Sequence, residues 1–185
     1  MKIENPDSIS KLLLHVCCAP CSTAIVECLL ENGIKPALFY YNPNIYPAEE
    51  YERRKAESVR HAASLGLEFI DADYNHGLWR EAVRGHEGEP ERGARCLQCF
   101  KHRLAVTAKF AYENGFKTFA TTLASSRWKS LEQIAQAGDY AASMFKGMKF
   151  LAQNWRKGGL SERRSALIRQ YGFYNQQYCG CEYSI

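Results

Sequence analysis

Several features that would define other classes of protein are missing from this sequence. No apolar run approaches the ~20 residues of a membrane-spanning helix. The opening residues, MKIENPDSISK, contain no apolar stretch of the kind that a secretory signal peptide needs. No internal repeat, low-complexity tract or linker is visible. We therefore expect a cytoplasmic protein without a membrane segment, whose 185 residues form a single domain.

Charge is nearly balanced. The chain has 24 Lys and Arg residues against 20 Asp and Glu residues, which gives a formal net charge of +4. A small positive excess is compatible with an RNA partner but does not by itself predict one.

Short apolar runs alternate with helical patterns along the chain. This alternation predicts an α/β fold with a mostly parallel sheet and helices on both faces. Residues after about 153 are interpreted as an appended lid and tail. The expected strands are 11–16, 35–41, 67–72, 117–122 and 149–153, and the clearest helices are 20–33, 48–65, 97–114 and 131–145.

Polar loops follow the expected strands. CCAPCS follows the first strand, NPNIYP the second, Asp71 and Asp73 the third, and TTLASSRWK the fourth. Ligands bind beyond the carboxyl ends of the strands in such sheets. The sequence therefore predicts that four loops converge on one edge of the sheet.

The eight cysteines need a chemical explanation. A chain of this size buries roughly 70% of its unfolded surface and does not need disulfides to fold. In a reducing compartment, clustered cysteines more often bind metal or do redox chemistry. Cys28 lies on the apolar face of an expected helix and is interpreted as a core thiol. The other seven form three groups: Cys17, Cys18 and Cys21; Cys96 and Cys99; Cys179 and Cys181.

Spacing leaves three interpretations of these thiols open. A structural zinc site takes four thiolates and leaves three unused, whereas thioredoxin-like exchange at one C-x-x-C leaves five unexplained. A [4Fe–4S] cluster also takes four, and the other three could hold a second metal or react. The neighbours Cys17 and Cys18 would more naturally serve two adjacent centres. Gly180 gives the backbone between Cys179 and Cys181 the freedom to turn both inward.

Other polar segments give weaker signals. RWK (127–129) and NWRKGG (154–159) mix aromatic and basic residues, which suits single-stranded RNA. Composition alone favours the alternative, an amphipathic surface with a partly buried Trp. EYERR (50–54) is interpreted as a solvated helix face. The segment before Cys96, GEPERGAR, is either a flexible surface loop or a charged wall. His15, inside an apolar strand, is interpreted as a hydrogen-bonded core histidine.

Taken together, five blocks resemble a known family. LLLHVCCAPCS, FYYNPNIYPAEEYERR, EPERGARCLQCFKHRL, TTLASSRWK and QQYCGCEYS occur in order over residues 12–184 and are similar to the QueH family of epoxyqueuosine reductases. The resemblance implies the last step of queuosine biosynthesis, in which the epoxide of epoxyqueuosine becomes the alkene of queuosine. The substrate would be the wobble base of tRNAs with GUN anticodons (Tyr, His, Asp and Asn). Electrons would come from an external donor, without cobalamin.

The resemblance also implies a [4Fe–4S] cluster next to a mononuclear metal, expected to be iron. The implied ligands are the seven grouped cysteines and one aspartate, Asp73 first and Asp71 second. Cys17, Cys18, Cys96 and Cys99 are expected to bind the cluster. The fold looks like the Rossmann-like HUP class of nucleotide-binding, tRNA-modifying enzymes, with HVCCAPCS in place of the glycine-rich phosphate loop. That departure argues against ATP.

Roles in the implied reaction follow as expectations. Reduction of an epoxide to an alkene needs two electrons, two protons and loss of the oxygen as water. Asp73, as a hard ligand, would make the second metal more oxygen-seeking. Tyr178, Tyr74 and Glu91 are candidate proton donors, and Trp128, Lys129 and Arg156 are candidate substrate contacts. The rival interpretations are a structural-zinc tRNA-binding module and a cluster-dependent, ATP-using tRNA thiolation enzyme.

Overall fold

The computed structural model describes residues 1–4, 9 and 11–184, which fold around a five-stranded sheet. All strand pairings are parallel and the order is β3-β2-β1-β4-β5. Each expected strand is present but shorter than expected, which confirms the predicted fold class. The strands are β1 (Leu12–His15), β2 (Ala37–Tyr40), β3 (Phe69–Asp71), β4 (Thr118–Thr121) and β5 (Lys149–Phe150).

The central strands are buried on both faces. Every residue of β1, β2 and β4 is buried, whereas β3 and β5 form the partly exposed edges. Continuous apolar runs such as LLL in β1 are typical of parallel strands covered on both sides. Leu13 pairs with Ala37 of β2 on one side and with Phe119 of β4 on the other.

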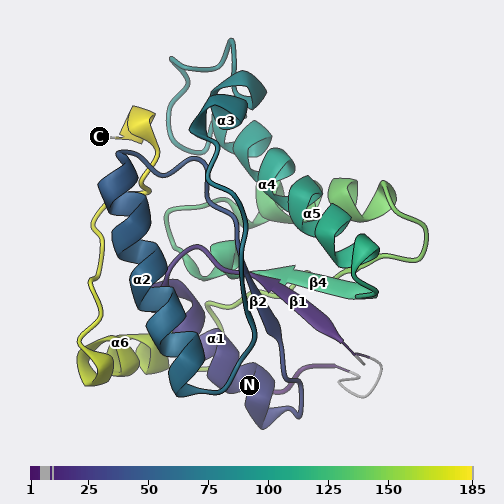
Figure 1. The fold of residues 1–185 in the computed structure, drawn as a ribbon, viewed down its shortest axis with the longest axis vertical. Coiled ribbons are helices and arrows are strands. Elements are labelled where there is room, and N and C mark those ends of the chain that lie inside the picture. The colour runs from purple at the N-terminus through teal and green to yellow at the C-terminus, as the bar shows by residue number, and fades with distance from the viewer. Residues whose placement is uncertain (5–8, 10, 185) are drawn as a thin grey trace.

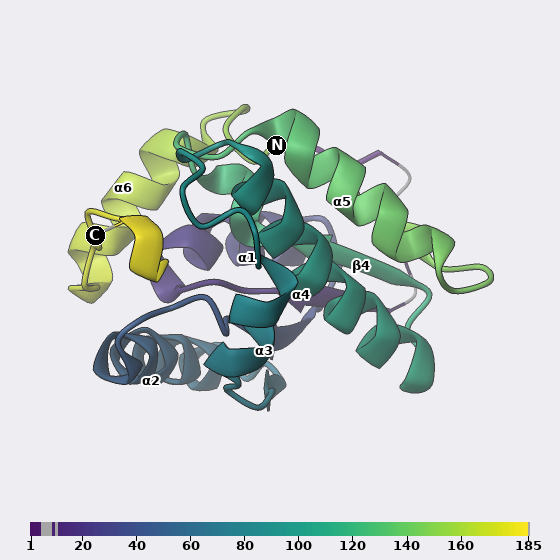
Figure 2. The ribbon, with the colours of Figure 1, turned by 90° about the horizontal axis from the view of Figure 1, so that it is seen from above.

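Helices cover the two faces of the sheet in separate layers (Figures 1 and 2). One layer contains α1 (Ala19–Glu31), α2 (Ala48–Ser64) and α6 (Leu160–Tyr171), and the other contains α3 (His76–Ala82), α4 (Ala94–Glu113) and α5 (Leu131–Ser143). Within the described residues, no helix is long and apolar enough to cross a membrane.

The strand order reverses between β1 and β4. In open α/β sheets such a switch point opens a crevice at the carboxyl ends of the strands, where ligands bind. Cys17 follows β1 at this point, and the 3₁₀ turn η2 (Thr122–Ser125) follows β4. The Cys17 N–H donates to Thr122 Oγ1 at 3.2 Å. The sheet therefore places the first cysteine group at the position that was expected for a ligand.

Residues after β5 form α6 and a tail. Helix α6 packs on α1, where Arg163 Nε lies 2.5 Å from Glu27 Oε2. The tail then runs beside α2 (Figure 1), and the Tyr174 N–H donates to Glu57 Oε1 at 2.9 Å. It ends in an antiparallel bridge between Ile45 and Cys181 and the 3₁₀ turn η3 (Glu182–Ser184). The interpretation of this region as a lid stays a prediction.

Candidate metal centre

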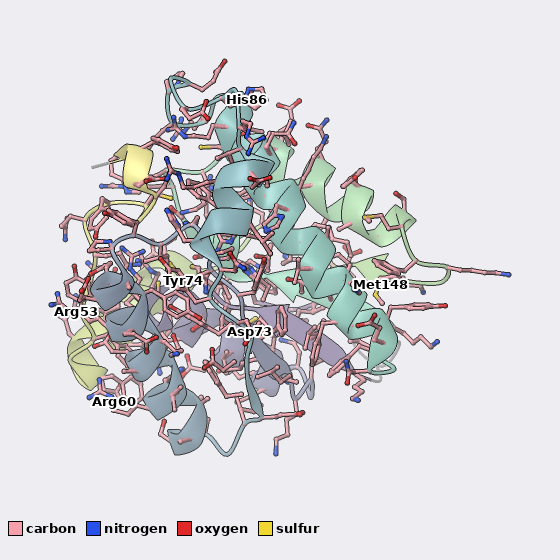
Figure 3. All side chains as sticks on the ribbon, turned by 45° about the horizontal axis from the view of Figure 1, so that its top comes forward. Arg53, Arg60, Asp73, Tyr74, His86 and Met148 are labelled. Atoms are coloured by element: carbon pink, nitrogen blue, oxygen red, sulfur yellow. The ribbon has the colours of Figure 1, made fainter. Side chains whose placement is uncertain are left out.

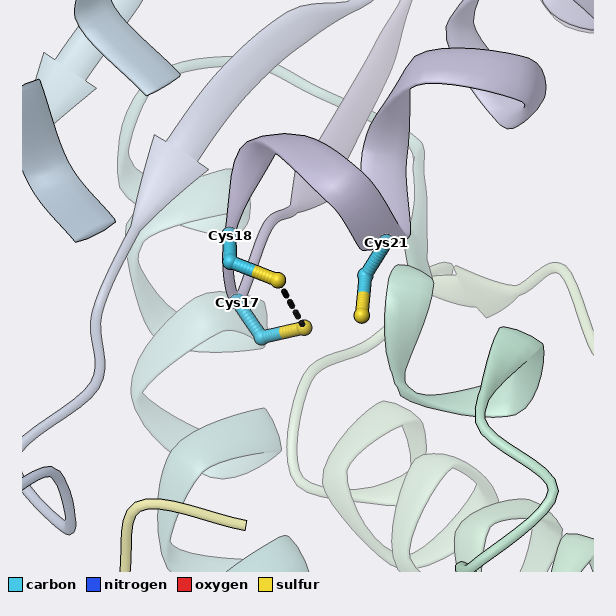
Figure 4. Close-up of side chains that lie close together, drawn as sticks. All are labelled: Cys17, Cys18 and Cys21. Atoms are coloured by element: carbon cyan, nitrogen blue, oxygen red, sulfur yellow. Dashed lines mark hydrogen bonds between the residues drawn. The ribbon is translucent and has the colours of Figure 1, made fainter. Parts of the chain in front are cut away.

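Three thiols lie together at the start of α1 (Figure 4). The Sγ atoms of Cys17 and Cys18 are 3.9 Å apart, and the sulfurs of Cys17, Cys18 and Cys21 all lie within 4.8 Å of one another. Cys18 immediately precedes α1, and its carbonyl accepts the N–H groups of Cys21 and Ser22, each at 3.2 Å. This turn brings Cys21 back over Cys17. A buried thiol group of this kind can bind a metal ion or a cluster.

The three thiols share their ionisation unequally. Hydrogen bonds from Cys18 and Cys21 hold the pKa of Cys17 well below its usual range. Burial, and then the neighbouring sulfur of Cys17, raises the pKa of Cys18, and the hydrogen bond with Cys17 raises that of Cys21 to about 11. One negative charge is thus favoured and further ones are opposed. A coordinated cation removes this opposition because it binds each sulfur as thiolate, so the donor set fits a metal.

The other four grouped thiols lie on α4 and in the tail. Cys96 and Cys99 lie in the first two turns of α4, and Cys179 and Cys181 lie in the tail. Burial raises the pKa of Cys96, Cys99 and Cys181, and the charge of Cys179 raises it further in each case. The four therefore form a second group. Among the described residues, only the first group is compact enough to have all its sulfurs within 4.8 Å.

Both thiol groups open into one cavity of about 700 Å³. Cys17 and Cys21 line it from the first group, and Cys96 and Cys179 from the second. The structure therefore brings thiols from three distant parts of the sequence to one site.

Buried cations compensate for the thiols. Arg54 is 3% exposed and Arg103 is 2% exposed, and both line the cavity. Arg54 Nη1 donates to the Cys179 carbonyl at 3.0 Å. Burial alone would lower the pKa of Lys129, but the charges of Cys179, Cys17 and Cys21 raise it overall. The ammonium of Lys129 thus faces both groups, and the site favours a negatively charged metal–thiolate centre.

Direct protein contacts hold the tail at the site. Gly180 has φ +95°, and a Cβ at this position would lie 2.8 Å from Nη1 of Arg54. The Gly180 carbonyl accepts the Tyr46 N–H at 2.8 Å. Beyond it, Glu182 Oε1 lies 3.3 Å from His76 Nε2 and 3.4 Å from Arg80 Nε. These contacts anchor the tail through the protein itself.

The structure does not bring the expected aspartates to the thiols. Asp73 is exposed on the segment after β3, beside Tyr74 (Figure 3), and Asp71 pairs with Lys55 Nζ at 3.2 Å. Neither lines the cavity. The reason is the strand order: β3 is an edge strand, two positions away from β1. Of the four loops expected to converge, those after β1, β2 and β4 line the cavity.

Most of the other candidate proton donors and substrate contacts line the cavity. Tyr178, Glu91, Trp128, Lys129 and Arg156 all line it. Tyr74 does not; its hydroxyl donates to the Ile45 carbonyl at 2.7 Å. Trp128 is 59% exposed, whereas Trp155 is 2% exposed and donates Nε1–H to the Thr121 carbonyl at 3.1 Å. The alternative of a buried tryptophan therefore holds for Trp155.

Core predictions from the sequence are confirmed for two residues. Cys28 is buried in the core. His15 is fully buried, with Nδ1 2.8 Å from Thr121 Oγ1 and Nε2 3.1 Å from the Tyr41 carbonyl. Burial, together with the charge of Arg103, lowers the pKa of His15 to about 3, so the ring is neutral.

The prediction of a solvated helix face for EYERR holds for Glu52 and Arg53 but is wrong for Glu50 and Arg54, and two site residues were missed. Glu50 and Arg54 are buried rather than solvated, because the tail covers this face of α2. Gln176, whose Nε2 lies 2.8 Å from Cys18 Sγ, and Arg92, whose N–H donates to Cys96 Sγ at 3.3 Å, were not singled out. Gln176 lies in one of the quoted blocks, so its nearness to the tail cysteines was the available signal.

The parallel sheet carries three clustered thiols at its switch point, and four cysteines from three parts of the chain line the cavity there. This arrangement defines a Rossmann-like protein with a thiol-rich site that could bind a metal or a cluster. The profile of the family described as "Epoxyqueuosine reductase QueH" matches residues 12–185. The chain belongs to this family, an oxidoreductase family of queuosine biosynthesis, which confirms the resemblance found in the sequence.

Curated relatives with the name epoxyqueuosine reductase QueH cover almost the whole chain. The protein from Acinetobacter baylyi is 47% identical over 185 residues, which are 100% of this chain and 85% of that protein. The one from Haemophilus influenzae is 45% identical, with 100% of this chain and 75% of that protein covered. The one from Thermotoga maritima is 33% identical, with 94% and 90% covered.

A solved structure supports the fold alone. The crystal structure of a predicted subunit of tRNA methyltransferase from Methanocaldococcus jannaschii matches with a TM-score of 0.56 at 15% identity. The match covers 90% of this chain and 93% of that one.

Proposed function

We propose that this chain reduces the epoxide of epoxyqueuosine in tRNA to the alkene of queuosine. The observation that carries the proposal is the compact group of Cys17, Cys18 and Cys21 at the switch point, beside a cavity that Cys96 and Cys179 also line, in a chain that belongs to the QueH family. The substrates would be the tRNAs with GUN anticodons, for Tyr, His, Asp and Asn.

The thiols would hold a [4Fe–4S] cluster and an adjacent mononuclear iron. A [4Fe–4S] cluster takes four thiolates, which is the size of the group formed by Cys96, Cys99, Cys179 and Cys181. The compact group of Cys17, Cys18 and Cys21 would then hold the single iron. This division by proximity differs from the expectation that Cys17 and Cys18 bind the cluster. When bound, these groups supply the two electrons, received from an external donor, and a Lewis acid for the epoxide oxygen.

Tyr178 is the proton donor that the geometry favours. Of the other two candidates, Tyr74 donates its hydroxyl hydrogen to the Ile45 carbonyl, and Glu91 is exposed. Tyr178 lines the cavity, and the Arg54 guanidinium lies 5.2 Å from its ring centroid. Burial, and then the charge of Glu50, raises the pKa of Tyr178 above its usual value, so its hydroxyl is protonated at neutral pH. It can give one of the two protons with which the oxygen leaves as water.

The substrate base would enter past Trp128. This side chain is exposed at the mouth of the cavity and has the Arg127 guanidinium 4.6 Å from its ring. Unpaired anticodon bases are recognised by stacking on aromatic side chains and by contacts to phosphate. Trp128→Ala should weaken tRNA binding by roughly 1–3 kcal/mol if the ring stacks on a base.

Reconstitution without oxygen tests the proposal. We expect about five irons and four sulfides per chain, and conversion of epoxyqueuosine to queuosine in tRNA, detected by mass spectrometry of digested nucleosides. About one zinc per chain without sulfide, or tRNA-dependent ATP hydrolysis without reduction, would contradict it.

Two serine variants test the division of the thiols. Cys99→Ser should lose most of the sulfide together with the iron of the cluster. Cys21→Ser should keep about four sulfides and lose about one iron. Loss of sulfide in both would show that the two groups act as ligands to one centre.

A further inference from the structure

Two arginines converge on the segment 126–129 at the mouth of the cavity. Arg92 donates Nε–H to the Trp128 carbonyl at 2.9 Å and Nη2–H to the Arg127 carbonyl at 2.8 Å. Arg156 comes from the opposite side and donates Nη2–H to the Lys129 carbonyl at 2.7 Å, and also to the Ser126 carbonyl. Both guanidinium groups are thus fixed in place by main-chain carbonyls.

Neither arginine has an acidic partner. Within the described part of the chain, no carboxylate oxygen lies within 4 Å of a charged side-chain nitrogen of Arg92, Arg127, Lys129 or Arg156. The acidic side chains at the two adjoining cavities are Glu91 and Glu132. Burial, and then the charge of Arg92, lowers the pKa of Arg156, which shows that the two cations repel each other. The pair is an electrostatic cost that an anion would remove.

Both arginines keep donors for a ligand. A guanidinium has five N–H donors in a planar fork. Arg92 uses two of them, and Arg156 uses only those of Nη2, while its Nε is buried without a partner. Arg92 and Arg156 both line the thiol cavity and a shallower cavity beside it. They therefore stand at the border between the two cavities.

The backbone of Arg92 is also unusual. Its φ is +67°, in the left-handed region that is sterically unfavourable for a residue with a Cβ. Gln133 Nε2 donates to the Arg92 carbonyl at 2.8 Å and so holds this conformation. On the other side of the Arg92 Cα, the Arg92 N–H donates to Cys96 Sγ at 3.3 Å. A strained backbone conformation persists only where surrounding contacts hold it in place, and such positions are often found at functional sites.

We propose that Arg92 and Arg156 form a binding site for one backbone phosphate of the tRNA anticodon loop. Arg forks match phosphate geometry, and their charges suit a phosphodiester at the entrance rather than the reacting base. Because Arg92 is joined to Cys96 through its own N–H, the bound phosphate fixes the distance between the RNA backbone and the thiols. This inference rests on the proposed function for the identity of the RNA.

The salt dependence of tRNA binding tests the phosphate site. The logarithm of the association constant falls linearly with the logarithm of salt concentration, and each lost phosphate contact reduces the slope by about 0.7–0.9. We expect Arg92→Gly and Arg156→Gln each to reduce the slope by about this amount, with an unmodified tRNA transcript as the probe. Lys146→Gln removes an exposed charge beyond the far end of α5 and should leave the slope unchanged.

The choice of glycine separates contact from strain. Arg92→Gly keeps the left-handed backbone and loses only the guanidinium, whereas Arg92→Ala loses both. Equal slopes in these two variants, and a slope restored by Arg92→Lys, would support a charge contact. A wild-type slope in Arg92→Gly and in Arg156→Gln would overturn the site. A second outcome would also overturn it, namely that inorganic phosphate binds the wild-type protein but not the two arginine variants, while the salt slope of tRNA binding is the same in all three proteins. The pair would then be a site for a free anion.

The two proposals can fail independently. Wild-type protein that shows the arginine-dependent slope but does not reduce epoxyqueuosine would refute the proposed reaction and leave the phosphate site standing. If Arg92→Gly and Arg156→Gln reduced epoxyqueuosine and kept the full salt slope, the proposed reaction would stand and the phosphate site would be refuted.

Discussion

Gly180 lies between the two tail cysteines, and the addition of one methyl group at this position should strongly disturb the attachment of the tail. Gly180→Ala places a Cβ 2.8 Å from Nη1 of Arg54, in a backbone with φ +95°. The left-handed backbone costs alanine about 1–2 kcal/mol. Arg54 cannot move away freely because it is buried and donates to Glu50 and to the Cys179 carbonyl. Loss of one such charge-assisted hydrogen bond costs about 1.5–3 kcal/mol.

The two costs together reach about 2.5–5 kcal/mol. The tail contributes little to the core, so the cheapest response is local detachment rather than global unfolding. We therefore expect Gly180→Ala to release the tail, to lose iron and to keep nearly the wild-type midpoint of urea unfolding. Chymotrypsin can report the release, because the tail contains Tyr174 and Tyr178.

Gly66→Ala is the matched control. Gly66 also has a positive φ, +61°, but a Cβ there meets nothing within 4 Å. Gly66→Ala should lose only about 1–2 kcal/mol to the left-handed backbone, with its tail still attached and its iron still bound. If Gly180→Ala resisted chymotrypsin and retained iron as well as Gly66→Ala does, the role assigned to the close approach of Arg54 would be wrong.

Three further substitutions test the core and the proton donor. Cys28→Ala should cost at most about 1–2 kcal/mol in urea unfolding and leave the visible absorption of the cluster unchanged, and bleaching would show that Cys28 is a ligand. Burial lowers the pKa of His61 below 6.5, so the unfolded chain binds the proton more tightly and stability falls as pH drops through this range. His61→Phe should therefore flatten the fall in unfolding free energy between pH 7.5 and 5.5, and an unchanged slope would contradict the assignment. Tyr178→Phe should lower the rate of single-turnover reduction without changing tRNA affinity or iron content, and a wild-type rate would exclude Tyr178 as the donor.

The parts of this fold that depend on local pattern could be predicted. The run LLLHV gives a buried strand, CCAPCS gives the start of a helix, and the spacing of Cys96 and Cys99 puts both on one face of α4, about one turn apart. These features are set by neighbouring residues and by the periods of helix and strand.

The parts that depend on strand order and distant contacts could not. Asp73 was expected at the site because it follows a strand, but nothing local shows that this strand lies at the edge of the sheet. Arg54 looked solvated because its cover, the tail at Cys179, lies 125 residues further along the chain. The left-handed backbone of Arg92 has no signal in the sequence, since neither glycine nor asparagine occupies the position.

The distance in sequence between the two thiol groups has a consequence for the order of folding. In a small zinc-binding module, neighbouring ligands let the metal nucleate the structure. Here the thiol of Cys17 meets that of Cys179 only after the sheet has formed, α6 has packed on α1 and the tail has paired with Ile45. Contacts of such long range form late, because their loop-closure entropy must be overcome first. Iron would therefore enter a protein that is already folded, and the rate of its capture should follow the closing of the tail rather than the collapse of the chain.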